Sequence, residues 1–133
     1  MIINENNIDQ TNPDTDKTVG IVAYITLIGF IISIILNADK KGEEKKFGAF
    51  HLRQSLGVLI VAVSFFIIIS IVTVVLTLIL PFLGVLFALV ANIAAIGFLV
   101  LMILGIINAA NGDYKEIPII GKYASKFLGN TFE

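Results

Sequence analysis

The chain has 133 residues, of which 57% are hydrophobic and only 14% are charged, and its net charge is −1. Soluble domains have roughly 45–50% apolar and about 25% charged residues, so this composition indicates one membrane-embedded domain, and the near-neutral charge suggests no nucleic-acid partner. The absence of cysteine excludes disulfides, thiolate catalysis and zinc–thiolate sites. The start, MIINENNIDQ, lacks the regions of a signal peptide, so residues 1–18 are expected to form a flexible acidic tail.

The first predicted element is Val19–Leu36, a run of 18 residues without a charge. A helix of this length rises about 27 Å, close to the roughly 30 Å hydrocarbon core of a bilayer. Most of its residues are Ile, Leu, Val or Phe, each of which favours insertion by about 0.3–0.6 kcal/mol. The alternative, a buried helix of a soluble core, is disfavoured because the run has no polar face. We therefore expect this segment to span the membrane.

The second uncharged stretch, Gln54–Gly112, has 59 residues and is too long for a single span. The segment Leu80-Pro81-Phe82-Leu83-Gly84 divides it, because proline cannot continue a helix and glycine permits a turn. Two further spans are thus predicted near 54–80 and 82–111, with Asn111-Gly112 as the final stop. Strands are rejected because an open sheet leaves backbone groups unpaired in lipid. The expected fold is all-α, a polytopic membrane protein with three transmembrane helices over residues 19–128.

The tail after these spans has helical periodicity. Its apolar residues recur at i, i+3, i+4, i+7 and i+8, and they are Ile120, Tyr123, Ala124, Phe127 and Leu128. Lys122 and Lys126 fall on the other side, and Pro118 suits a first helical turn. This pattern predicts a short amphipathic interfacial helix over 117–128, followed by a tail at 129–133. Packing against a soluble partner is the alternative.

Lysine and arginine set the expected orientation. The loop 37–53 and the C-terminal tail together carry eight of the nine basic residues, whereas the N-terminal tail carries only Lys17. With three spans, that loop and the C-terminus share one side of the membrane. We therefore expect a multi-pass protein of the plasma (inner) membrane, with its N-terminus outside and its C-terminus in the cytoplasm.

The segment FHLRQ stands at the predicted entrance of the second span and holds the only histidine and the only arginine of the chain. His51 lies about 200° from Arg53 around a helix, so a joint catalytic pair is disfavoured. Arg53 is the last charge before lipid and is expected to donate through its bidentate fork to a carbonyl, a carboxylate or a lipid phosphate. The predicted docking or lipid-headgroup rim consists of Phe50, His51, Arg53, Gln54, Lys122 and Lys126.

Small residues recur at four-residue spacings in the third predicted span. They are Gly84, Ala88, Ala91, Asn92 and Ala95. Such spacings allow close helix packing in lipid. Asn92 is expected to make an interhelical hydrogen bond rather than to bind an ion. No Asp, Glu, Lys or Arg lies within a predicted span, so a proton relay is not supported.

No motif in the chain points to chemistry. A Gly-rich phosphate loop, a nucleophile elbow and a histidine metal motif are all missing from the sequence. We therefore predict no catalytic residue, no cofactor and no metal ion, and we do not expect an enzyme. A lipid-modifying enzyme that uses His51 is the weakest alternative left open.

FHLRQSL, Phe50–Leu56, resembles the FHARQAL-type motif of small bacterial membrane proteins of unknown function. These proteins are grouped with the twenty-kilodalton Tic subunit, an import component of the chloroplast inner envelope. Asp16-Lys17 before a span with Ala23-Tyr24 agrees with this resemblance, as does the tail, in which Gly112, Tyr114, Pro118, Gly121 and Ala124 are similar to G-x-Y…P-x-x-G-x-x-A. The likeness covers about residues 16–128. The plastid proteins are described with four spans, whereas only three can be drawn here.

Two functional hypotheses follow. The first is a non-catalytic membrane subunit or scaffold of a larger complex, for which the resemblance implies a link to protein translocation. The second is a small transport or channel protein formed by self-association. The expected partners are membrane lipids together with other membrane proteins or further copies of the chain.

Overall fold

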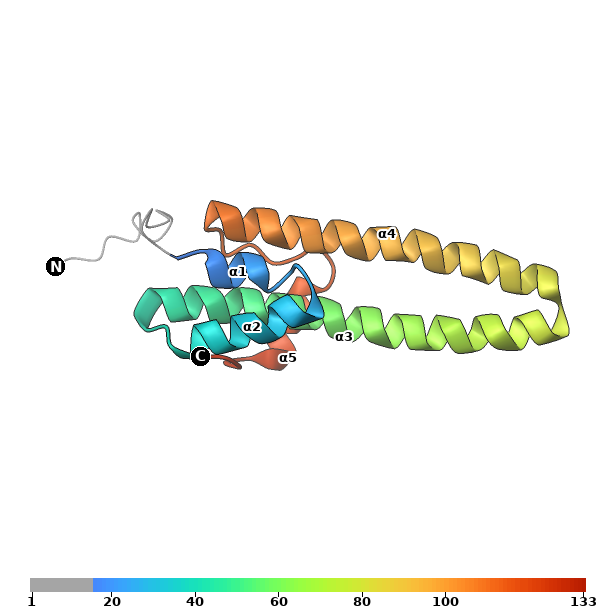
Figure 1. The fold of residues 1–133 in the computed structure, drawn as a ribbon, viewed down its shortest axis with the longest axis horizontal. Helices are drawn as coiled ribbons and strands as arrows, with labels where there is room; N and C mark the ends of the chain where they lie inside the picture. The colour runs from blue at the N-terminus through green and yellow to red at the C-terminus, as the bar shows by residue number, and fades with distance from the viewer. Residues whose placement is uncertain (1–15) are drawn as a thin grey trace.

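The computed structural model describes residues 16–133, and all regular elements in this part are helices. They are α1 Thr18–Val22, α2 Leu27–Ala38, α3 Gly42–Ile79, α4 Pro81–Asn111 and α5 Gly121–Leu128. Figure 1 shows α3 and α4 as a long antiparallel hairpin, with α1, α2 and α5 gathered at one end of it. Most of the predicted N-terminal tail, residues 1–15, lies outside the described residues.

The hairpin is broken where the sequence predicted. Leu80 is extended, with φ −141° and ψ 98°, because the residue before a proline avoids the helical region. Pro81 then opens α4, where its missing N–H costs nothing. Gly112 closes α4 with φ 74°, a left-handed conformation that glycine adopts freely, so the predicted stop is also confirmed. The predicted start of this helix was wrong, since α3 begins at Gly42 and not near Gln54.

The predicted first span was also wrong, because Val19–Leu36 does not form one helix. α1 ends at Val22, and Thr26 caps α2 by accepting a 3.0 Å hydrogen bond from the N–H of Gly29 to its hydroxyl oxygen. A side chain at Gly29 would lie 2.5 Å from the carbonyl oxygen of Val22, so glycine is what allows this tight turn. α2 has 12 residues and rises about 18 Å, too little to cross a bilayer.

Three spans are therefore not confirmed. Among the described residues, two helices are long and apolar enough to cross a membrane, namely α3 with 38 residues and α4 with 31. Their lengths correspond to about 57 and 47 Å. Both exceed the thickness of the roughly 30 Å hydrocarbon core, so part of each helix must lie outside it.

That other part belongs to a packed head. We use "head" for residues 16–58, which include α1, α2 and the start of α3, together with residues 105–133, which include the end of α4 and α5. Two apolar clusters lie in it, one around Tyr24, Phe47, Val58, Ala109, Ile117 and Ile120, the other around Val19, Ala23, Phe30 and Leu52. The rest of the hairpin, Leu59–Leu104, is called the shaft, and it exposes mostly Ile, Leu, Val and Phe.

Both described ends of the chain lie at the head (Figure 1). The carboxylate of Asp16 forms an ion pair with Lys40, 2.5 Å apart, in the loop that follows α2. At the other end, the ring of Phe132 meets that of Phe30 with 6.0 Å between centroids. The predicted placement of the two ends on opposite sides depended on an odd number of spans, and this geometry does not support it.

Candidate functional site: a polar clamp on α3

The polar side chains of FHLRQ all bind segments that are distant in sequence. His51, Arg53 and Gln54 project from the head part of α3, and His51 and Gln54 are fully buried. Their partners lie in the chain after α4 and in the turn after α1. We call these three side chains the clamp, because together they hold the beginning and the end of the described chain on one helix.

His51 uses both ring nitrogens. Its Nε2 lies 2.9 Å from the backbone carbonyl oxygen of Asp113, and its Nδ1 lies 3.0 Å from the hydroxyl of Tyr24. A carbonyl only accepts, so Nε2 carries the proton and the Tyr24 hydroxyl donates to Nδ1. The neutral imidazole thus joins the turn after α1 to the segment after α4. No nitrogen is left to act as a base or to hold a metal.

Aromatic rings enclose this histidine. Phe47, Phe50 and Tyr24 meet the imidazole edge-on, with centroids 4.6, 5.1 and 5.8 Å away. Tyr114 covers Phe47 and Phe50 in turn, at 5.4 and 5.3 Å. Such edge-on pairs add stability beyond the apolar area they bury. They also keep water from the hydrogen bonds of His51.

Gln54 makes three hydrogen bonds to the chain that follows α4. Its Oε1 accepts from the N–H of Ile117 at 3.0 Å, while its Nε2 donates to the Gly121 carbonyl at 3.0 Å and to the Ser125 hydroxyl at 2.9 Å. A buried amide with this many partners fixes both position and orientation of what it binds. One side chain therefore seats the start of α5 against α3.

The helix contact beside Gln54 is unusually close. A Cβ at Gly57 would lie 2.5 Å from the Cβ of Ala124, so only glycine allows α5 to approach α3 here. Lys122 and Lys126 are on the exposed side of α5. α5 begins at Gly121 rather than at 117, because Ile119 has φ 69° and cannot belong to a right-handed helix. Contact of the two lysines with lipid stays a prediction.

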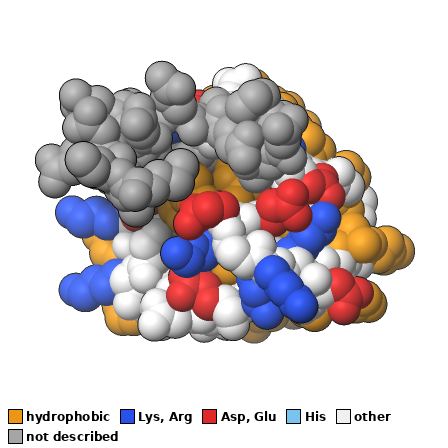
Figure 2. Space-filling view, turned by 90° about the vertical axis from the view of Figure 1, so that its left-hand side faces the viewer, with side chains coloured by type: hydrophobic (Ala, Val, Ile, Leu, Met, Phe, Trp, Pro, Cys, Tyr) orange, Lys and Arg blue, Asp and Glu red, His pale blue; other side chains and the backbone are white. Residues whose placement is uncertain are grey.

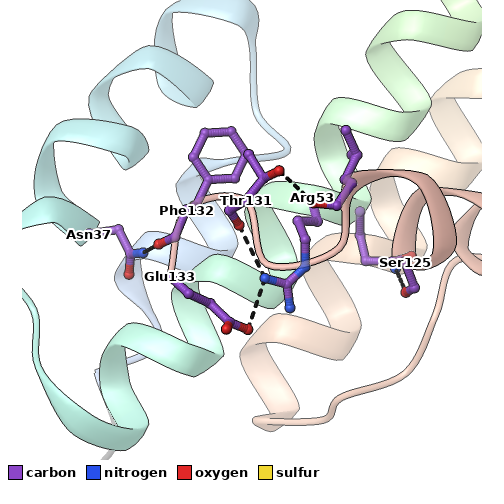
Figure 3. Close-up of polar contacts among 8 residues, drawn as sticks. Asn37, Arg53, Ser125, Thr131, Phe132 and Glu133 are labelled. Carbon is purple, nitrogen blue, oxygen red and sulfur yellow. Dashed lines mark hydrogen bonds and ion pairs between the residues drawn. The ribbon is translucent and has the colours of Figure 1, made fainter.

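Arg53 holds the last residues of the chain. Its Nη1 donates to the carbonyl of Thr131 and to the carboxylate of Glu133, both at 3.1 Å (Figure 3). Asn37 adds a 3.2 Å bond from its Nδ2 to the carbonyl of Phe132. We call Thr131–Glu133 the strap. The acceptors are of the expected kinds, but one nitrogen serves both, so these contacts do not use the bidentate fork.

The small residues predicted to pack helices lie in the shaft. Gly84 faces α3, where a Cβ would lie 2.8 Å from the Cβ of Thr77. Ala88 and Ala91 are half-buried, whereas Asn92 and Ala95 are exposed. The Nδ2 of Asn92 donates to the carbonyl of Ala88 in its own helix at 2.8 Å. The expected interhelical bond of Asn92 is therefore not made within the described part of one chain.

Sequence reasoning missed both partners of His51, the Tyr24 hydroxyl and the Asp113 carbonyl. Tyr24 was counted as a span residue, although a hydroxyl in an apolar run signals a need for a partner. The carbonyl of Asp113 carries no sequence signal at all, since every residue has one. Among the described residues, no group of three or more His, Asp or Glu side chains could hold a metal ion.

Residues 15–124 match the model of the MamF/MmsF family, described as the magnetosome magnetite crystal formation protein family. The chain belongs to this family. The matched region includes the clamp and its partners as far as Ala124 in α5, and it stops before the strap. No curated protein and no solved structure matches the chain.

This family overturns the suggested kinship with the chloroplast import component. The matching family model is that of MamF/MmsF, so the resemblance through FHLRQSL was wrong as an assignment. Its residues have a structural explanation instead. His51 and Gln54 bind the chain at Asp113, Ile117 and Gly121, which includes the G-x-Y…P-x-x-G region. The inferred link to protein translocation is withdrawn with the resemblance.

Proposed function

We infer that the chain is a non-catalytic membrane component of magnetite crystal formation in magnetosomes. The observation that carries this proposal is the family match over residues 15–124. The clamp supports the non-catalytic part. The polar atoms of His51 and Gln54 that a reaction would need are engaged by Tyr24 and by the backbone of the tail. These groups build the head and are not free to act on a substrate.

The charges support an orientation in the membrane. All nine Lys and Arg side chains belong to head segments, and none lies between Gln54 and Gly112. Figure 2 shows basic and acidic side chains interspersed on the end face of the head. Basic residues near spans are enriched on the cytoplasmic side. The proposal therefore places the head at the cytoplasmic face and the shaft in the bilayer.

The test is complementation in a magnetosome-forming bacterium from which its own members of this family have been deleted. The chain should fractionate with purified magnetosome membranes and move crystal size, measured by electron microscopy, toward that of the undeleted strain. Gln54→Leu should lose this effect, whereas Ser64→Ala, an exposed shaft residue, should keep it. Normal recovery in magnetosome membranes with unchanged crystals would contradict the proposal.

A second candidate, self-association, is favoured by Asn92. Its side chain is exposed on a helix that the proposal places in lipid, and its amide oxygen accepts no hydrogen bond from the described residues. Polar side chains in lipid favour partners on other helices, at about 0.6–2 kcal/mol each. A second copy, packed on the exposed face of α4 that carries Asn92 and Ala95, would supply one. A transport path would require such an assembly, because one hairpin encloses none.

Cross-linking distinguishes the two candidates. Ala95→Cys should form disulfide-linked dimers in membranes, and the added change Asn92→Leu should reduce them. Ile67→Cys, on the exposed face of α3, is the matched control and should stay monomeric. Equal cross-linking at both positions would indicate random collisions between chains rather than a specific dimer. The self-association candidate would then be rejected.

A further inference from the structure

We propose that the tip of the hairpin, Thr77–Gly84, docks in the boundary between acyl chains and headgroups of the far leaflet and never enters water. The occupant of this surface is the phospholipid of the bilayer that holds the shaft. This placement rests on the proposed position of the shaft in the bilayer, on the geometry of the tip and on the length of the shaft.

The side chains of the tip require an apolar neighbour. Leu78 is 82% exposed, Phe82 77% and Ile79 68%, and the turn between the helices carries no charged residue. A loop that emerges into water normally has polar residues at its turn. The one hydroxyl here, that of Thr77, donates a 2.7 Å hydrogen bond to the carbonyl of Thr73 in its own helix, so it needs no water molecule as a partner.

The backbone of the tip limits how deep in the membrane the tip can lie. The N–H of Leu80 bonds to Leu76, and those of Leu83 and Gly84 both reach the Leu80 carbonyl. No described N–H donates to the carbonyls of Thr77, Leu78 and Ile79. Unpaired carbonyls are costly in the hydrocarbon centre. They can be hydrated only near the headgroups, so the tip lies at that depth and not deeper inside the membrane.

The length of the shaft agrees with both limits. The near boundary lies close to Gly57, where α5 with its exposed Lys122 and Lys126 rests on α3. From Gly57 to Ile79 the helix rises about 33 Å. The hydrocarbon core is about 30 Å thick and the full bilayer about 40–45 Å. An upright shaft therefore ends just past the far edge of the core and stops short of bulk water.

One consequence rests on the proposed function. If the head is cytoplasmic, the described part of the chain presents no charged side chain to the magnetosome interior. The chain would then influence the crystal through the membrane or through cytoplasmic partners, and not by side chains that touch the mineral.

Cysteine labelling in phospholipid vesicles tests the placement, because the chain has no cysteine of its own. Phe82→Cys is treated with a membrane-impermeant maleimide outside intact vesicles, then on both sides of opened vesicles, and finally after solubilisation in denaturing detergent. We expect labelling only in detergent. Lys41→Cys, in the head, is the positive control and should react without detergent from the face that carries the head.

Reaction of Phe82→Cys in opened vesicles to the same extent as Lys41→Cys would overturn the proposal. Reaction from the face that labels Lys41→Cys would also overturn it, because the shaft would then not cross. Leu78→Cys provides the same readout should Phe82→Cys fail to insert. No magnetite is involved, so this test can succeed or fail independently of the complementation experiment.

Discussion

The head and the shaft share two continuous helices but are held together in opposite ways. In the head, α3 buries Gly48, Ala49, Leu52 and Gly57 together with polar His51 and Gln54. In the shaft, the same helix exposes Ile60, Val63, Ile67 and Ile71 and makes no hydrogen bond to another of the described elements. A bilayer can cover apolar side chains without specific contacts. The head, whose segments must pack specifically against one another, depends on close glycine contacts and on the hydrogen bonds of the clamp.

From this contrast we expect the most damaging single substitution to be one at Gln54. Gln54→Leu leaves the N–H of Ile117, the carbonyl of Gly121 and the hydroxyl of Ser125 without their partner. Each buried unpaired group costs about 1–3 kcal/mol. We expect α5 to detach, detected as rapid amide hydrogen exchange over 117–128 in detergent micelles. Ser64→Ala in the shaft is the control, and equal exchange in the two variants would show that the clamp does not hold the tail.

Replacing one glycine in the head and one in the shaft compares how tightly the two regions are packed. Gly57→Ala brings its Cβ to 2.5 Å from that of Ala124, and overpacking of this kind costs about 1–3 kcal/mol. Gly97→Ala in the shaft meets nothing within 4 Å and gains up to about 1 kcal/mol of helix propensity. Thermal unfolding in the same detergent should therefore shift down for the first and up or not at all for the second. A shift of the same sign for both would contradict the division into head and shaft.

Arg53 gives a smaller effect. Arg53→Ala should release the strap at a cost of about 1 kcal/mol, since Glu133 is partly exposed. Lys45→Ala, near the start of α3 and outside the clamp, should have less effect. Arg53→Lys should keep part of the hold, because a single nitrogen makes both contacts. The measurement is the mobility of a spin label at Asn130, an exposed position next to the strap. Wild-type mobility in Arg53→Ala would show that the strap is held by Phe30 and Asn37 alone.

The smallest effect is that of pH at Asp16. Its hydrogen bond and ion pair with Lys40, together with hydrogen bonds from Thr18, lower the pKa of this carboxyl from 3.8 to about 2. Because the folded-state pKa is depressed, the contribution is complete above about pH 4 and is lost as the pH falls toward 2. An NMR titration should find the lowered pKa, and Lys40→Ala should return it toward 3.8. An unchanged pKa in that variant would exclude the pair as its cause.

The shaft was largely predictable from the sequence and the head was not. The long run without charges and the position of Pro81 were enough to locate the hairpin, because membrane-spanning helices are recognised by their apolar composition. The first run failed because Thr26 and Gly29, which make a cap and a tight turn, carry no charge and so did not interrupt the predicted span. FHLRQ was recognised as unusual, but its partners include backbone groups such as the Asp113 carbonyl, which leave no mark in a sequence.

The central claim is that both described ends of the chain lie with the head on one side of the membrane. Single cysteines at Thr18 and Lys122, both exposed, test it most directly in sealed membrane vesicles of uniform orientation with an impermeant maleimide. The account predicts that both positions react from the same face, as does Lys41→Cys. Reaction of Thr18→Cys from the face opposite to Lys122→Cys would restore a spanning first segment and contradict the account.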